Sequence, residues 1–359
     1  MGADLKTLFQ SYLFAYVFWV TLSLGCMGLL LMHHIFRAQW GRAILRMLEA
    51  GSRTLPLMLV AALPIALMAL PELYPWARPA EVAGDAVLKH RSVYMNPMGF
   101  MLRAAIYYAV WIGLSVVLNR SSLRQDRTGD QNEAQLRSNV SAPGLVAFVL
   151  SVTFAFNDWV MSVEPHWTST IFGVGGLING ILGALALLTF LLMRQAGGGP
   201  LAAVVNKTVV RDLGNMMLAF TMFWAYITLS QFLIIWSGNL PGETAYYAAR
   251  NASGWGPVGT ILILGQFALP FLALVANRTK RTPGLLMCVA GWAFLFRIVD
   301  IYWIVMPSLR RTGFSPHWLD FAALIILGAV WFAVFAWSFA SNPRIARHAP
   351  ATEEVAGHA

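Results

Sequence analysis

The chain has 359 residues, of which 58% are hydrophobic and 11% are charged, and its mean hydropathy is +0.62. A soluble globule of this size needs far more polar surface, so this composition excludes a soluble protein and predicts a polytopic membrane protein. The formal net charge is +9, but the basic residues lie in short loops between apolar runs, where they orient a chain against a membrane. A nucleic-acid-binding role is therefore disfavoured.

Apolar runs long enough to cross a bilayer recur nine times along the chain. A hydrocarbon core of about 30 Å needs roughly 20 apolar residues of helix. The predicted spans are 11–33, 54–71, 99–119, 143–163, 170–193, 215–237, 255–276, 284–306 and 317–340. We therefore expect an all-α fold in which residues 1–340 form a single integral membrane domain and residues 341–359 form a mobile cytoplasmic tail.

Prolines and glycines indicate where these helices bend or pack closely. The second span is short and interrupted by proline, and Pro257 and Pro270 predict kinks in the seventh. The fifth span carries small residues at helical spacing, namely Gly173, Gly176, Gly180 and Gly183. Such a stripe lets a neighbouring helix approach closely, so it predicts packing and no chemistry.

Lysine and arginine residues predict the orientation of the chain. Loops on the side of the N-terminus carry eight of these residues, and loops on the opposite side carry sixteen. Because cytoplasmic loops are enriched in positive charge, the C-terminus is predicted to be cytoplasmic and the N-terminus to lie outside.

The two cysteines, Cys26 and Cys288, both lie in apolar spans and have no metal-binding or cluster-binding spacing. They cannot supply a covalent haem, an iron–sulfur centre or a zinc site. A cytochrome b would need histidine pairs on two helices, whereas His33 and His34 are adjacent and His166 is placed at the other membrane face. The chain is expected to bind no metal or redox cofactor of its own.

The turn between the fourth and fifth spans concentrates ionisable groups at the predicted outer face. Asp158, Glu164 and His166 fall within ten residues of one another, and Trp159 and Trp167 flank them. Ionisable groups at membrane depth are costly, so the cluster is a candidate for proton transfer or quinol binding. In the second case His166 or Asp158 accepts a proton from the quinol and Trp167 borders the ring. The structural alternative is a hydrogen-bonded interfacial turn with two tryptophan anchors.

Arg297 and Asp300 lie three residues apart in the eighth span, and therefore on one helix face. They are placed roughly 10–15 Å below the outer end of the helix. A structural ion pair is the favoured interpretation, with a proton relay as the alternative. Asp158→Asn or Asp300→Asn is expected to leave assembly intact and to lower turnover or proton release.

Several uncharged polar residues lie within the predicted spans. Buried hydroxyls and amides usually bond neighbouring helices, but a set that lines one cavity can hold a chain of water. These residues are Asn179, Thr221, Tyr226, Thr228, Ser230, Gln231 and Gln266. Tyr226 and Gln231 are included with the ionisable groups above as candidate proton-path residues.

Three stretches of sequence resemble one family. They are Ser162-Val163-Glu164-Pro165-His166-Trp167 followed by Ser169-Thr170-Ile171-Phe172-Gly173; Phe223-Trp224-Ala225-Tyr226-Ile227 leading to Ser230-Gln231-Phe232-Leu233-Ile234-Ile235-Trp236 and Asn239-Leu240-Pro241; and Arg103-Ala104-Ala105-Ile106-Tyr107. From about residue 90 to 340 the chain resembles the F subunit of alternative complex III, a bacterial quinol:electron-acceptor oxidoreductase of the NrfD-like (polysulfide-reductase) superfamily.

The resemblance implies a multi-pass subunit of the bacterial inner membrane, built from four-helix bundles. It implies a homologous C subunit as neighbour, and iron–sulfur and multihaem cytochrome c subunits on the outer face. The quinol pocket of that family is attributed to the C subunit. The family usually has ten spans with both ends inside, so nine predicted spans imply that the first is missing.

Three functions follow as hypotheses. The leading one is a cofactor-free membrane subunit of a quinol-oxidising respiratory complex that forms part of a proton path. The second is that this chain itself binds quinol. The third is a stand-alone secondary transporter, which is disfavoured because the two halves share no pattern of matching broken helices.

Overall fold

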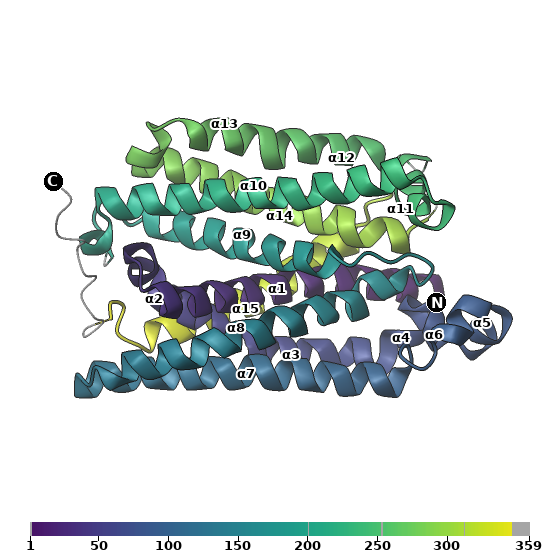
Figure 1. Cartoon of the computed structure of the whole chain (residues 1–359), viewed down its shortest axis with the longest axis horizontal. Coiled ribbons are helices and arrows are strands. Elements are labelled where there is room, and N and C mark those ends of the chain that lie inside the picture. The colour runs from purple at the N-terminus through teal and green to yellow at the C-terminus, as the bar shows by residue number, and fades with distance from the viewer. Residues whose placement is uncertain (1, 200, 253, 312, 347–359) are drawn as a thin grey trace.

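The computed structural model describes residues 2–199, 201–252, 254–311 and 313–346, and within them the chain is helical with no strand. Nine segments of this part are long and apolar enough to cross a membrane (Figure 1). The predicted all-α, multi-pass architecture is therefore confirmed. The predicted tail 341–359 lies outside the described residues from position 347 onward.

The first half of the bundle comprises eight α-helices. Its helices are α1 (Gly2–Phe36), α2 (Gln39–Ser52), α3 (Leu55–Pro64), α4 (Leu70–Leu73), α5 (Pro79–Gly84), α6 (Ala86–Arg91), α7 (Pro97–Thr128) and α8 (Asn132–Trp159). The second half comprises α9 (Phe172–Met193), α10 (Lys207–Gly238), α11 (Pro241–Ala252), α12 (Gly256–Leu262), α13 (Leu269–Val275), α14 (Pro283–Leu309) and α15 (Trp318–Ala340).

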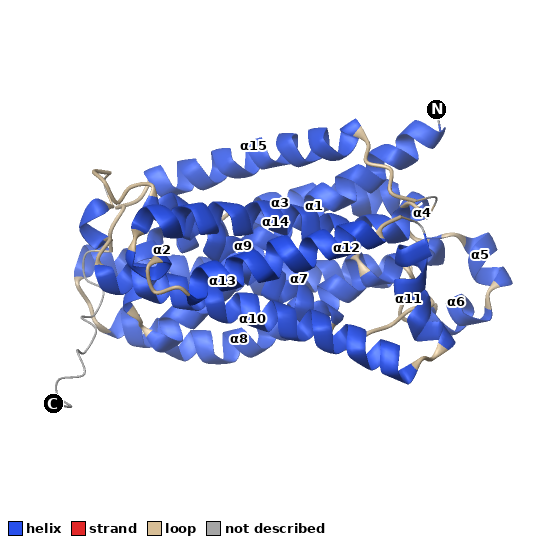
Figure 2. Ribbon diagram, turned by 90° about the horizontal axis from the view of Figure 1, so that it is seen from above, coloured by secondary structure: helices blue, strands red, loops and turns tan. Residues whose placement is uncertain are grey.

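The long helices run side by side, so the bundle has two ends. We call the end at which α1 begins the N-terminal end, and it also carries the short helices α5, α6 and α11 (Figure 1, right). The opposite end, where α1 finishes and α15 finishes, is the C-terminal end. Figure 2 shows α15 along one edge of the same bundle.

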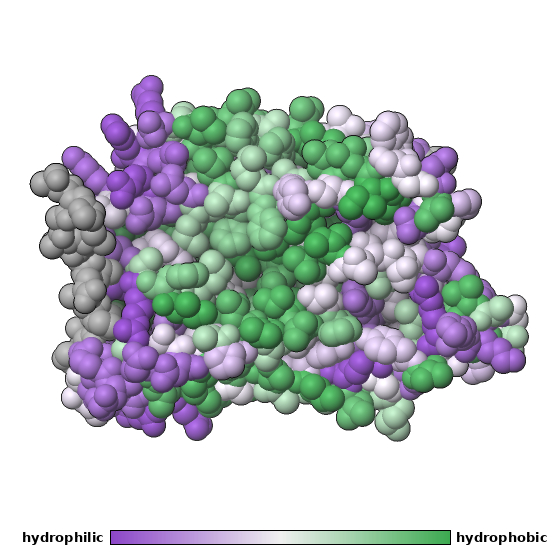
Figure 3. Space-filling view, in the orientation of Figure 1, coloured by the Kyte–Doolittle hydropathy of each residue, from purple (hydrophilic) through white to green (hydrophobic). Residues whose placement is uncertain are grey.

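Two helices form the centre of the bundle. The most apolar stretch of α1 is 100% buried and that of α9 is 89% buried, against 22–39% for the other seven spans. The surrounding helices therefore turn apolar side chains outward, and Figure 3 shows them as a hydrophobic band between two hydrophilic ends. A band of this kind is the surface that a lipid bilayer covers.

The second span is longer than predicted, because it runs from Gln39 to Leu73 and not from residue 54 to 71. The hydropathy of its first part is lowered by Arg46 and Glu49, which are 4% and 1% exposed. Arg46 bonds Glu49 at 2.5 Å and also bonds Asp126 of α7. Paired charges can be buried in this way, but a residue-by-residue hydropathy sum counts each of them as exposed.

The proline-containing spans contain π-helical turns. One turn covers Ile65–Ala69 directly after Pro64, and another covers Ile263–Ala268 directly before the turn that holds Pro270. A π turn adjusts the hydrogen-bond ladder around a proline that cannot donate. Pro257, by contrast, lies in the first turn of α12, where a proline starts a helix and does not bend it.

The glycine stripe of α9 brings other helices close, as its spacing predicts. A Cβ on Gly180 would lie 2.5 Å from the backbone oxygen of Thr21 in α1.

We expect Gly180→Ala to lower the free energy of unfolding by about 1–3 kcal/mol or more, because the Thr21 backbone cannot move aside as a side chain can. Gly113→Ala is the matched control, since a Cβ there meets nothing within 4 Å. Equal midpoints of thermal unfolding for the two variants would contradict this packing.

Candidate functional site

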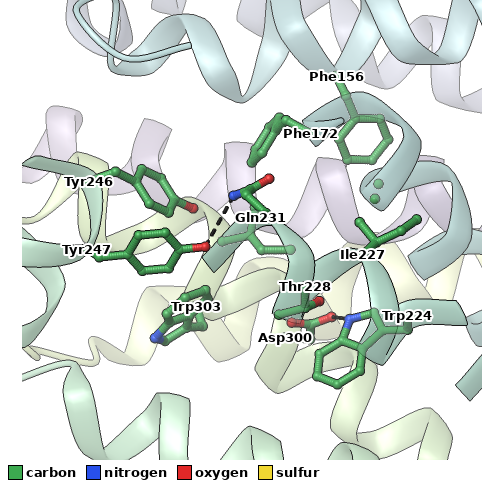
Figure 4. Close-up of a pocket in the computed structure, with 13 residues that line it drawn as sticks. Phe156, Phe172, Trp224, Ile227, Thr228, Gln231, Tyr246, Tyr247, Asp300 and Trp303 are labelled. Carbon is green, nitrogen blue, oxygen red and sulfur yellow. Dashed lines mark hydrogen bonds between the residues drawn. The ribbon is translucent and has the colours of Figure 1, made fainter. Parts of the chain in front are cut away.

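A cavity of about 60 Å³ lies among α8, α9, α10, α11 and α14, towards the N-terminal end (Figure 4). Aromatic and other apolar residues make up most of its walls, but several polar groups also line it. The residues that line it are Phe156, Phe172, Gly175, Gly176, Trp224, Ile227, Thr228, Gln231, Tyr246, Tyr247, Asp300, Trp303 and Ile304.

Asp300 supplies the one carboxylate of this lining, and it is only 2% exposed. Asn179 donates to its Oδ2 at 2.5 Å and the Trp224 indole donates to the same oxygen at 2.9 Å. Arg297 lies 3.1 Å from that oxygen, so the ion pair predicted from the three-residue spacing is confirmed. A buried carboxylate with these partners is satisfied as an anion and can still exchange a proton through a cavity.

The Arg297 guanidinium is 1% exposed, and none of its three nitrogens makes a hydrogen bond within the described residues. Its attraction to Asp300 is therefore ionic, because the geometry falls short of a hydrogen bond. The group also lies 5.2 Å from the centre of the Trp224 ring, and its stem packs beside Gly183. Asp300 is thus the partner that offsets the buried positive charge.

One face of α10 carries a row of polar side chains that leads from the N-terminal end to Asp300. Gln231, Thr228, Trp224 and Thr221 follow one another at intervals of three or four residues, which keeps them on one helix face. The row spans about 15 Å along the helix axis. Thr221 is 1% exposed and its hydroxyl has no hydrogen-bond partner in the part of the chain that is described.

Helix α11 closes the cavity with two tyrosines, which the sequence analysis did not single out. The Gln231 amide donates to the Tyr247 hydroxyl at 3.3 Å (Figure 4). The Ser169 hydroxyl donates to the Gln231 oxygen at 3.1 Å. Tyr246 stacks on Trp167 with ring centres 4.0 Å apart. Burial raises the pKa of Tyr247 to about 12, so its hydroxyl keeps its proton at neutral pH.

Asp158 belongs to a different cluster, on the α7 side of the bundle. It accepts from Arg103 at 2.8 and 3.1 Å and from the Tyr107 hydroxyl at 2.9 Å. The Arg103 guanidinium also covers the Tyr94 ring at 3.8 Å. Asp158 is 3% exposed, so the carboxylate is held by a two-pronged arginine contact and does not face the cavity.

Glu164 and His166 have separate partners, so the predicted cluster of Asp158, Glu164 and His166 does not form as one group. Glu164 lies 3.5 Å from Arg311 in an exposed contact. The His166 side chain is 56% exposed and its Nε2 lies 2.6 Å from Asp85 in the connection before α6. The three side chains diverge because α8 ends at Trp159 and a short 3-10 turn, Met161–Val163, redirects the chain.

The remaining candidates divide between the cavity and the surface. Trp167 is buried and reaches the cavity through Tyr246, and Gln231 lines it directly. Tyr226 is 67% exposed on the outer face of α10, away from the cavity. Its neighbours Trp224 and Thr228 occupy the inner face, which a helical spacing of 3.6 residues requires.

The Asp85 carboxyl, which caps the short helix α6, makes that helix sensitive to acid. Asp85 caps α6 by accepting from the backbone of Leu88 and Val87, and these bonds together with His166 lower the pKa of its carboxyl. Because the pKa is lower in the folded state, the ionised carboxyl stabilises the fold at pH values above about 3.9, the ordinary pKa of an aspartate. This stabilisation is lost as the pH falls through the pKa of the folded state. We therefore expect the protection of the Ala86–Arg91 amides against hydrogen exchange to decrease only as the pH falls below about 3.9.

Hydrogen exchange at a series of pH values, corrected for its intrinsic pH dependence, measures the protection of the α6 amides. Asp85→Asn keeps a side-chain acceptor but has no carboxyl to titrate, so its profile is expected to be flat. The interpretation is wrong if both proteins give the same acid dependence.

Within the described residues, no group of three or more His, Cys, Asp or Glu side chains is placed to hold a metal ion. Cys26 is buried and Cys288 is exposed, and they lie on α1 and α14 as free thiols. The expectation that the chain binds no cofactor of its own stays a prediction.

Comparison with known proteins gives no family for the chain. No protein-family model and no curated protein matches it.

Proposed function

We propose that this chain is an integral membrane subunit of a quinol-oxidising respiratory complex of the alternative complex III type, and that it conducts protons through the cavity above Asp300. The observation that carries the proposal is a buried carboxylate, Asp300, that lines a cavity together with the polar side chains of Thr228, Gln231 and Tyr247 inside a helical bundle. The sequence resemblance to the F subunit supports the choice of complex.

The volume of the cavity favours protons over a larger ligand. One water needs about 10–15 Å³ of such space, so 60 Å³ holds about four to six waters. An apolar cavity that takes benzene measures about 150 Å³, so a quinol ring does not fit without movement of the walls. The lining offers water the two to four polar partners it needs, through Thr228, Gln231, Tyr247 and Asp300.

The proposed path runs from the N-terminal end inward. Tyr247 and Gln231 lie at the entrance, Thr228 continues the row, and Asp300 receives or releases the proton. Asp300 lies nine residues before Leu309, the last residue of α14, or about 14 Å along the helix axis. Thr221 lies deeper on the same face and is the next hydroxyl towards the membrane centre.

The wider assignment follows the predicted orientation. The N-terminal end would face the outside of a bacterial inner membrane, beside iron–sulfur and multihaem cytochrome c subunits, with a homologous NrfD-like C subunit carrying the quinol pocket. This chain would hold no electron carrier. Haem c and the iron–sulfur clusters would belong to its partners.

Purification of the tagged chain from its native membrane tests this assignment. We expect haem-bearing and iron–sulfur subunits and a second NrfD-like chain to co-purify, together with quinol oxidation. A monomer that transports a solute alone, or a monomer that carries its own haem, would overturn the proposal.

Quinol binding by this chain is the second candidate, and the composition of the same cavity favours it. Trp224, Phe172 and Trp303 offer aromatic faces, while Gln231 and Tyr247 offer hydrogen bonds to ring hydroxyls. Photo-crosslinking of a quinone analogue to α10 or α11 would select this function. The absence of crosslinks there, with crosslinks in the C subunit, would select the proton path.

A further inference from the structure

We infer that the C-terminal end of the bundle contains a binding site for a phosphate group, such as that of an anionic phospholipid headgroup. The site is a small cavity of about 20 Å³ where the end of α1, the start of α2 and the start of α8 meet. His33, His34, Arg37, Arg42 and Arg137 line it, and no Asp or Glu is among its lining residues. It lies at the opposite end of the bundle from the cavity above Asp300.

The cations of this site are not neutralised by the hydrogen bonds they make. Arg137 is 4% exposed, and its hydrogen bonds to described residues go to the neutral side chains of Ser121 and Gln125, at 3.2 and 2.5 Å. Among the described residues, the Arg37 side chain donates to the Ala134 backbone oxygen and to the Gln135 side chain. Arg42 makes no ion pair and no side-chain hydrogen bond within the described residues, although it lines the same small cavity as His33.

The neighbouring carboxylates are bound to other arginines. Glu49 and Asp126 both bond Arg46, and Glu133 bonds Arg124 at 2.9 Å. Three arginines therefore face one small space in which the described part of the chain supplies no contacting anion. Such a concentration of charge is stabilised when an outside anion binds there.

Two buried histidines point to a ligand independently of the arginines. His33 and His34 are each 5% exposed, and His33 Nδ1 and His34 Nε2 have no hydrogen-bond partner among the described residues. Buried polar atoms are normally satisfied, so each unpaired one needs an explanation. A phosphate oxygen that accepts from one of these ring nitrogens would supply it.

The backbone around the site is also arranged for an anion. Arg37 has a φ of +52°, in the left-handed region that non-glycine residues rarely adopt, and this conformation turns the chain from α1 into α2. Helix α2 begins at Gln39 with Ala38 at its N-cap, a residue that has no side chain able to cap. The positive end of the α2 dipole thus lies one turn from Arg42.

The size of the cavity and its position limit the ligand. About 20 Å³ holds roughly one oxygen-sized group, so only phosphate oxygens enter and the rest of the molecule stays outside. Arg37 is exposed and Arg42 partly exposed, which leaves the mouth open at the end of the membrane-spanning band. Basic pockets between helices at a membrane surface bind anionic headgroups in this way.

Arg42→Gln tests the site, because no described side chain bonds Arg42 and would be left unpaired by its removal. Arg194→Gln is the matched control, since Arg194 is an exposed arginine at the same end of the bundle, at the end of α9. The purified full chain is titrated with phosphatidylglycerol, phosphatidylcholine or inorganic phosphate, and binding is followed by native mass spectrometry. We expect phosphatidylglycerol to bind more tightly than phosphatidylcholine, and Arg42→Gln to weaken it about fivefold, the effect of one cation near a charged headgroup.

The arms of the titration distinguish the sources of the phosphate. If phosphatidylglycerol binds and inorganic phosphate does not displace it, the ligand is a lipid. If inorganic phosphate alone binds, the ligand is a soluble phosphate. Either result supports the site, provided that Arg42→Gln weakens the binding and Arg194→Gln does not. Equal effects of the two substitutions, or no preference for phosphatidylglycerol together with no binding of phosphate, would overturn the inference.

Discussion

Asp300→Asn is expected to lower the free energy of unfolding by about 3–5 kcal/mol, which is the cost of removing one partner from a buried ion pair. The asparagine oxygen can still accept from Asn179 and Trp224, but Arg297 keeps its charge with no hydrogen bond to any described residue. The loss therefore comes from the unpaired guanidinium. Unfolding in mixed micelles measures it.

The double variant Asp300→Asn with Arg297→Met is expected to recover most of this stability. Since no nitrogen of Arg297 makes a hydrogen bond within the described chain, methionine fills the space of its stem without leaving a partner unsatisfied. Asp212→Asn is the control, because its pair with Arg211 is exposed and worth about 0–1 kcal/mol. If the double variant is as unstable as the single one, the ion pair is not what Asp300 contributes.

Arg103→Gln is expected to cost about 3 kcal/mol of unfolding free energy, the low end of the range for a broken buried pair. Asp158 is 2% exposed at its side chain and would keep the hydrogen bond from the Tyr107 hydroxyl, whereas Arg103 is 20% exposed, which lets water replace part of the contact. Arg103→Lys should lose less, because lysine keeps the charge but cannot make the two-pronged contact.

Arg78→Gln is the comparison for Arg103, since the Arg78–Glu81 pair is exposed on both sides. Its effect on the unfolding midpoint is expected to be within the error of the measurement, because surface pairs contribute about 0–1 kcal/mol. A similar fall for Arg103→Gln and Arg78→Gln would mean that Asp158 does not depend on its arginine.

Contacts between residues close in sequence were predictable, and those between distant residues were not. Arg297 and Asp300 share a helix face, so their spacing alone predicts the pair. Asp158 is bonded by a residue 55 positions away, and Glu164 and His166 face partners 147 and 81 positions away. Nearness in the sequence suggested one cluster for these three, but helix packing directs each side chain to a different neighbour.

The cavity could not be predicted from the sequence alone, although the spacing of the α10 residues near it was visible there. The spacing of Thr221, Trp224, Thr228 and Gln231 marks one face of α10 and separates Tyr226 from it. The placement of α11 against that face depends on how four helices meet, which no periodicity encodes. The start of the second span was likewise predicted too late, because a hydropathy sum does not account for the ion pairs that allow Arg46 and Glu49 to be buried.

The most direct test of the proton path is proton release by the purified complex in liposomes, measured with a pH-sensitive dye during quinol oxidation. The Asp300→Asn, Arg297→Met complex should assemble with the same subunits, yet release fewer protons or turn over more slowly than the unaltered complex, because the buried titratable group is gone. Unchanged turnover together with unchanged proton release in a fully assembled double variant would contradict the account.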